Sequence, residues 1–88
     1  MNLRTKMERF AERNGLSMLY YRNYGYKDKY EDISIHYGEH VLNTEVADGV
    51  ATKIIIFHSV PMTRDEYLTL NEAFKAFRKI MNEENDND

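Results

Sequence analysis

The sequence predicts an α+β domain in which an antiparallel β-meander of three to four strands is flanked by an N-terminal helix and a long C-terminal helix, in the order α-β-β-β-β-α. Three observations lead to this prediction. Apolar residues recur at helical spacing near both ends of the chain, strand-forming runs fill the middle, and short turns separate those runs. Because strands joined by tight turns pair with their neighbours, we expect a meander. A chain of 88 residues supports one domain, which we place at residues 1–81.

The first helix is expected at about residues 3–14. Its apolar face carries residues spaced at i, i+4, i+7 and i+8, namely Leu3, Met7, Phe10 and Ala11. Asn2 can cap the start of this helix, because its side-chain oxygen accepts a hydrogen bond from a free backbone N–H group. Gly15 supplies the left-handed conformation in which helices end.

The first two strands are expected at residues 16–24 and 30–37, because both runs are rich in aromatic and β-branched residues. Residues 25–29 contain a glycine and several polar residues, which is typical of a hairpin loop. The second strand alternates cleanly between two faces: Ile33, Ile35 and Tyr37 on one, and Asp32, Ser34 and His36 on the other. This alternation predicts that the isoleucine face is buried.

The next two strands are expected at residues 40–47 and 50–60. Between them, Asp48-Gly49 favours a two-residue hairpin turn, in which both turn positions need positive φ. Such a turn sets two pairs opposite one another, Leu42 with Ile55 and Val46 with Ala51. The alternative is a three-stranded sheet in which residues 40–47 are irregular.

The C-terminal helix is expected at residues 64–82. Thr63 and Glu66 have the spacing of a capping box, and Met62 and Tyr67 occupy the positions of a hydrophobic staple. The apolar stripe of this helix comprises Tyr67, Leu70, Phe74, Phe77 and Met81. We expect the stripe to be core, because a sheet this small needs a helix to bury one face.

The composition favours a cytoplasmic protein that does not contact membranes. The chain has no cysteine, so disulfides and thiolate metal sites are excluded. It has no apolar run of membrane-spanning length, and because its first residues include no apolar core of a signal peptide, we expect no secretory leader. Its formal net charge is −3. Residues 1–30 carry seven Lys/Arg against three Asp/Glu, whereas residues 31–88 carry five against twelve. Residues 82–88 are acidic and rich in asparagine, which predicts a disordered tail.

One motif with catalytic associations occurs, at residues 36–40. His36-Tyr37-Gly38-Glu39-His40 has the pattern H-x-x-E-H, which resembles the inverted motif of zinc peptidases. That chemistry needs both histidines on one helical face, whereas this segment ends a strand and contains a glycine. The alternative is a loose metal contact by His36, His40 and His58. We expect ordinary surface histidines, no bound metal, no cofactor and no enzymatic activity.

The most informative feature is the distribution of tyrosine. Six of the seven tyrosines lie between Tyr20 and Tyr37, interleaved with basic residues. Tyrosine combines a large contact area with a polar tip, and it is enriched at recognition surfaces. The candidate partner-binding residues are Tyr20, Arg22, Tyr24, Tyr26, Lys27, Lys29 and Tyr30.

These observations favour a small, non-enzymatic regulatory protein that binds a protein partner through its tyrosine-rich hairpin. The alternatives are a nucleic-acid binder that uses the same Tyr/Arg/Lys hairpin, and a hairpin whose aromatic pairs only stabilise the sheet. A homodimer formed through Leu68 or Ile80 is a further alternative. In composition, the chain resembles accessory proteins of low-GC bacteria and of phages or mobile elements, including small inhibitors of host systems.

Overall fold

The fold is that of an α+β protein, as predicted. A computed structural model of the chain describes residues 2–24 and 29–86. Its elements are, in chain order, α1 (Leu3–Arg13), β1 (Ser17–Tyr24), β2 (Lys29–Tyr37), β3 (His40–Ala47), β4 (Val50–Ser59), β5 (Met62–Glu66) and α2 (Leu70–Asp86). The strands form one antiparallel sheet in the order β1-β2-β3-β4-β5, so the meander has one strand more than we expected. Residues 40–47 form a regular strand.

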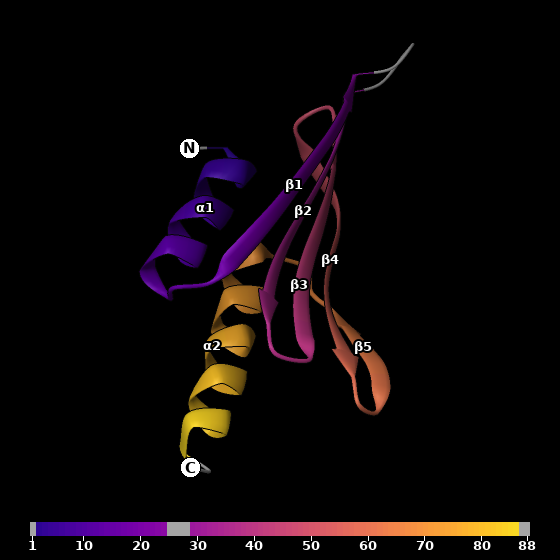
Figure 1. The fold of residues 1–88 in the computed structure, drawn as a ribbon. Coiled ribbons are helices and arrows are strands. Elements are labelled where there is room, and N and C mark those ends of the chain that lie inside the picture. Colours follow the sequence, from indigo (N-terminus) through magenta and orange to yellow (C-terminus); the bar gives the residue numbers. More distant parts are fainter. Residues whose placement is uncertain (1, 25–28, 87–88) are drawn as a thin grey trace.

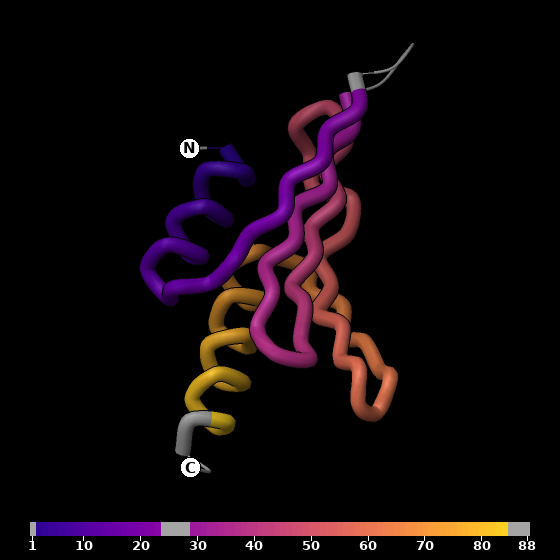
Figure 2. Tube along the Cα trace, viewed as in Figure 1, coloured from indigo at the N-terminus to yellow at the C-terminus, as the bar shows by residue number. Residues whose placement is uncertain are grey.

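Both helices cover the same face of the sheet (Figure 1). The core lies between them and the sheet, and it comprises side chains from five elements: Met7, Phe10, Ala11, Ile33, Ile35, Leu42, Val46, Ile54, Ile56, Leu70, Ala73, Phe74, Phe77 and Met81. The trace in Figure 2 shows the strands running beside one another, with the β4–β5 hairpin at the end of the sheet farthest from α1. Within the described residues, no helix is both long and apolar enough to cross a membrane.

The boundaries of α1 follow from its capping residues. The backbone N–H of Thr5 donates to Oδ1 of Asn2 at 2.8 Å, which confirms the predicted N-cap. At the other end Gly15 has a φ of 64°, and the Leu16 N–H donates to the Ala11 carbonyl at 2.8 Å. A residue with a Cβ would be strained at this φ, so glycine determines where the helix ends.

The β3–β4 hairpin contains a bulge that the sequence did not reveal. Asp48 and Gly49 both have positive φ, and Val46 lies opposite Ala51, as predicted. Leu42, however, lies opposite Ile56 and not Ile55, because the register shifts beside Thr52. The Thr52 hydroxyl donates to the Glu45 carbonyl at 3.2 Å. As a result the middle isoleucine of the Ile54–Ile56 run lies on the face away from the helices.

The predicted start of the C-terminal helix is wrong. Residues 62–66 form β5, in which Thr63 pairs with His58, so the expected capping box and staple do not exist. Thr69 performs the capping role instead: its Oγ1 accepts the N–H of Glu72 at 3.2 Å. These two residues have the same Thr-x-x-Glu spacing, and α2 begins directly after the threonine.

The rest of α2 differs from expectation only at its ends. Leu70, Phe74, Phe77 and Met81 form the buried stripe as predicted. Tyr67 precedes the helix but still lies against the core, and so does Ile80. Leu68, which we considered for helix pairing, also precedes α2 and is 93% exposed. Residues 82–86, which we assigned to the acidic tail, belong to the helix.

Replacing Thr69 by alanine tests this revised helix start. The Thr69→Ala variant is expected to lose about 1 kcal/mol of unfolding free energy, because the N–H of Glu72 loses its acceptor. Thr63→Ala is the matched control, since Thr63 lies in an exposed edge strand, and its cost should be at most about 0.5 kcal/mol. Urea denaturation followed by circular dichroism measures both values. A larger loss in Thr63→Ala would contradict the assignment.

Candidate functional site

The sheet has one face that neither helix covers, and we call it the open face. Because directly paired residues in an antiparallel sheet point to the same side, the register defines this face row by row. One row comprises Leu19, Ser34, Asn43, Ile55 and Glu66. The rows on either side comprise Ser17, His36, Val41, Phe57 and Arg64, and Tyr21, Asp32, Glu45 and Lys53.

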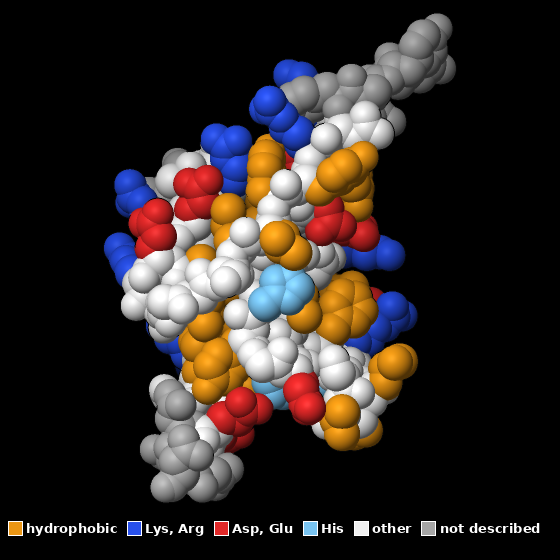
Figure 3. Space-filling model, in the orientation of Figure 1, with side chains coloured by type: hydrophobic (Ala, Val, Ile, Leu, Met, Phe, Trp, Pro, Cys, Tyr) orange, Lys and Arg blue, Asp and Glu red, His pale blue; other side chains and the backbone are white. Residues whose placement is uncertain are grey.

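Apolar side chains are exposed on the open face. Leu19 is 63% exposed and Tyr21 is 60% exposed, and both lie on the edge strand β1. Phe57 on β4 is 38% exposed. Ile55, also on β4, points to the open face and is only 3% exposed. It is not part of the core under the helices. The space-filling view likewise shows hydrophobic side chains at the surface over the strands (Figure 3).

A polar network holds one carboxylate in place on the same face. The side-chain amide of Asn43 donates to Oδ1 of Asp32 at 2.6 Å and to Oγ of Ser34 at 3.0 Å. The Tyr30 hydroxyl donates to Oδ2 of Asp32 at 3.4 Å. Burial of its ring, and then the negative charges of Glu45 and Asp32, raise the pKa of Tyr30. Tyr21 and Tyr30 therefore lie beside the negative charge of Asp32.

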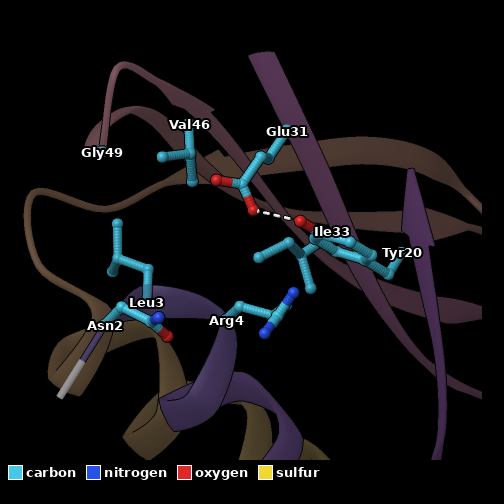
Figure 4. A pocket seen from close by; sticks show the side chains of 8 residues that line it. All are labelled: Asn2, Leu3, Arg4, Tyr20, Glu31, Ile33, Val46 and Gly49. Atoms are coloured by element: carbon cyan, nitrogen blue, oxygen red, sulfur yellow. Dashed lines mark hydrogen bonds between the residues drawn. The ribbon is translucent and has the colours of Figure 1, made fainter. Parts of the chain in front are cut away.

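Tyr20, the first of the predicted binding residues, lies on the helix-covered side. It pairs with Ile33, and its ring is partly buried against the core. Its hydroxyl donates to Oε2 of Glu31 at 2.5 Å, and the Arg4 guanidinium lies 5.1 Å from the ring centroid. The side chains of Arg4, Tyr20 and Glu31 line a cavity of about 230 Å³ (Figure 4). The other residues that line it are Asn2, Leu3, Ile33, Val46 and Gly49.

Of the other predicted binding residues, the three whose side chains the structure describes do not all lie on one face. Arg22 is exposed and pairs with Glu31, so it lies on the same side as Tyr20. Lys29 is exposed at the start of β2, whereas Tyr30 lies on the open face. The side chain of Tyr24, and all of Tyr26 and Lys27, lie outside the described residues.

The exposed residues that sequence reasoning missed are Leu19, Tyr21 and Phe57. Alternation along β1 separates Tyr20 from Tyr21, but it does not say which of the two is covered by a helix. That depends on the pairing of β1 with β2, and β2 begins one residue earlier than we expected, at Lys29. Had we expected four residues between β1 and β2 in place of five, the pairing would have predicted that Leu19 and Tyr21 are the exposed residues.

A second surface feature is a basic groove between α1 and α2. This groove has a volume of about 550 Å³ and is lined by Lys6, Arg9, Phe10, Arg13, Asn14, Asn71, Phe74 and Arg78. The described lining residues thus include four cations and no carboxylate. The rings of Phe10 and Phe74 stack at 4.2 Å, and the Arg78 guanidinium lies 5.5 Å from the Phe10 ring. Figure 3 shows basic side chains on the α1 side of the molecule, with acidic ones among them.

The histidines of the H-x-x-E-H pattern lie on opposite faces of the sheet. His36 is on the open face, whereas His40 follows the turn at Gly38 and lies on the helix-covered side beside His58. The pattern therefore does not have the arrangement of the peptidase motif. Among the residues that the structure describes, no group of three or more His, Asp or Glu side chains is arranged to hold a metal ion.

The chain was compared with protein-family models, with curated proteins and with solved structures. None of the three comparisons found a match.

Proposed function

We propose that this chain is a small, non-enzymatic binding protein that acts on a protein partner through the open face of its sheet. The observation that carries the proposal is that both helices cover one face, while the other exposes Leu19, Tyr21 and Phe57. The proposed surface is still centred on the β1–β2 hairpin, but the proposed contact residues on β1 are Leu19 and Tyr21 in place of Tyr20. In line with its composition, we further propose an accessory or inhibitory role in a bacterium or phage.

Leu19 and Tyr21 support this proposal because they are neighbours on one face of β1. Phe57 lies on the same face, but on β4, with β2 and β3 in between. Apolar groups that adjoin one another at a surface often mark interaction sites, whereas single exposed ones need no explanation. Tyrosine and phenylalanine are also among the residues enriched in the centres of protein interfaces. β1 also lies at the edge of the sheet, and an edge strand is where an extended segment of a partner can add to a sheet.

The charges of the open face favour a particular kind of protein partner. Asp32 is held beside the aromatic residues by Asn43, and Glu45 lies next to it in the same row. A surface with an apolar centre and a lysine or arginine at its border would complement this arrangement. A phosphate group would be repelled by these two carboxylates. Lys53 in the same row and Arg64 opposite Phe57 give the rest of the face positive charge as well.

The proposal predicts that a double variant, Leu19→Thr with Tyr21→Thr, loses its partner while remaining folded. Threonine keeps a high strand propensity and removes the apolar surface. Central interface residues contribute about 2 kcal/mol or more each, so the amount captured should fall by more than about tenfold. The measurement is affinity capture from cells of the source organism, followed by mass spectrometry.

The matched control for this capture is Leu68→Thr, which removes an even more exposed apolar residue outside the sheet. A photo-crosslinking residue at position 21 should give a discrete protein adduct, and one at Lys75 on α2 should not. Equal capture by the double variant and the wild type, or adducts from position 75 alone, would refute the open face as the binding surface.

A second candidate function is nucleic-acid binding, and it is the basic groove that favours it. Four cations and no carboxylate line this groove in a chain of net charge −3, and the stacked Phe10 and Phe74 lie among them. Cationic grooves with aromatic rings bind single strands by neutralising phosphates and by stacking on bases. In this alternative the ligand occupies the helical side of the molecule.

The test for this alternative is fluorescence anisotropy with a labelled single-stranded oligonucleotide. If four phosphates are neutralised, affinity should fall by roughly 50-fold between 50 and 200 mM salt. Arg9→Ala with Arg13→Ala should weaken binding and flatten this salt dependence. Lys75→Ala with Lys79→Ala removes the same charge outside the groove and should not. Absence of binding at low salt would exclude the alternative.

A further inference from the structure

The two histidines on the helix-covered side form a continuous series of contacts with two carboxylates. His40 on β3 and His58 on β4 are directly paired, and their Nδ1 atoms lie at a hydrogen-bond distance of 2.7 Å. Nε2 of His40 lies 2.6 Å from Oε1 of Glu84 on α2, and Nε2 of His58 lies 3.2 Å from Oδ2 of Asp65 on β5. We call these four side chains the histidine relay, and it joins four elements of the fold.

The three contacts of the histidine relay determine how many hydrogens its rings carry. An ionised carboxylate only accepts hydrogen bonds, so the Nε2 atom of each histidine must carry a hydrogen. The contact between the two Nδ1 atoms needs one more, because one nitrogen must donate and the other must accept. Two neutral imidazoles supply two N–H groups, whereas the relay uses three. One ring is therefore doubly protonated, and the pair carries a single positive charge between two negative ones.

The ionisable groups around the two rings suit a single positive charge. Glu84 faces the rings from α2 and Asp65 faces them from β5, and both are carboxylates. On β2, the residue paired with His40 is the uncharged Tyr37. Glu39 lies in the turn just before His40. The histidine side chains are 16% and 17% exposed, so most of their surface is covered while solvent can still exchange protons with them.

We propose that the histidine relay is a pH-sensitive clamp that holds the C-terminal end of α2 on the sheet while the two rings share one extra proton. Met81 is the last residue of the buried stripe, and side chains 82–84 are exposed. Glu84 brings this part of the helix into contact with the sheet through His40. Its carboxylate also lies over the β2–β3 turn, 3.9 Å from where a Cβ at Gly38 would be. Loss of the proton, or uptake of a second one, leaves the two Nδ1 atoms without a hydrogen bond and releases the helix end.

The number of bound protons gives the direction of the pH effect. An ordinary imidazole titrates near about pH 6.5, so the two histidines of the unfolded chain bind two protons well below this pH and none well above it. The clamped protein binds one. Stability rises with pH where the unfolded chain binds more protons than the folded protein, and it falls with pH where the unfolded chain binds fewer. The contribution of the clamp is therefore largest near about pH 6.5 and declines on both sides.

The first test is a nitrogen-15 NMR experiment on the wild-type full-length chain labelled at histidine. A proton shared by the Nδ1 atoms of His40 and His58 couples the two nitrogen nuclei through the hydrogen bond. A cross-peak between them is therefore expected at about pH 6.5, and it should disappear roughly two pH units or more to either side. The Cα chemical shifts of residues 82–84 should move towards coil values over the same range. Absence of the cross-peak at every pH, or Cα shifts that stay helical throughout, would overturn the proposal.

The second test is urea denaturation at a series of pH values. In the wild type, the folding equilibrium constant should fall by up to about tenfold for each pH unit above the optimum, because unfolding releases one proton. His40→Gln and His58→Gln should each flatten this part of the profile. The matched control is His36→Gln, which removes the third histidine on the opposite face and should keep the wild-type profile. A His40→Gln profile parallel to that of the wild type, or an equal flattening in His36→Gln, would contradict the clamp.

Discussion

Replacing Phe77 by alanine is expected to lower the free energy of unfolding by about 3–5 kcal/mol. Phe77 is completely buried, and its ring lies 6.2 Å from that of Phe10 on α1 and 6.5 Å from that of Tyr37 on β2. One side chain therefore connects α2 with both the other helix and the sheet. A domain of this length has a total stability of about 4–13 kcal/mol, so the variant loses a large fraction of it.

Thermal and urea unfolding, monitored by circular dichroism, measure this loss. For a domain of this size the melting temperature should fall by roughly 12–40 °C. Leu68→Ala is the control, because it removes a side chain that is 93% exposed and should change stability by at most about 0.5 kcal/mol. Similar losses in the two variants would mean that α2 does not cover the sheet through its apolar stripe.

The features that could be predicted from sequence are those that neighbouring residues determine. The start of α1 depends on Asn2 and its end on Gly15, and the structure agrees with both. The buried stripe of α2 follows from the spacing of its own apolar residues. The turn at Asp48-Gly49 likewise follows from two residues that tolerate positive φ.

Features that depend on distant parts of the chain were predicted poorly. Residues 62–66 carry a local helix signal, yet they form β5 because pairing with β4 satisfies their backbone groups at the edge of the sheet. Thr69 and Glu72 repeat the same spacing, so the local pattern could not decide between two helix starts. The bulge beside Thr52 is similarly invisible in the sequence, because it adds one residue without changing the alternation on either side.

The candidate site was affected most, because a sheet register that shifts by one residue exchanges its two faces. With a five-residue loop ending at Lys29, Tyr24 would pair with Tyr30 and Tyr20 would point away from the buried isoleucines. The strand in fact begins at Lys29, and Tyr20 pairs with Ile33. The exposed aromatic residue on β1 is therefore Tyr21, the neighbour of the Tyr20 that we selected.

This exchange of faces leads to the second large expected effect, which compares Tyr20→Thr with Tyr21→Thr. Threonine retains strand propensity, so the difference between the variants reports the surroundings of each ring. Tyr20→Thr is expected to lose about 2–3 kcal/mol, because it removes partly buried ring contacts, the hydrogen bond to Glu31 and the cation–π contact with Arg4. Tyr21→Thr should lose at most about 0.5 kcal/mol, since its ring is 60% exposed.

Urea denaturation gives both stabilities, and affinity capture by the same two proteins separates structure from recognition. If the open face binds the partner, Tyr21→Thr weakens capture at unchanged stability, whereas Tyr20→Thr reduces capture only in proportion to the unfolded fraction. Tyr20→Phe refines the comparison, because it keeps the ring and removes only the hydroxyl that donates to Glu31. The opposite result would be that Tyr21 is required for folding and Tyr20 for capture. It would show that β1 and β2 pair one residue out of the register described above. The binding surface would then lie on the other face of β1.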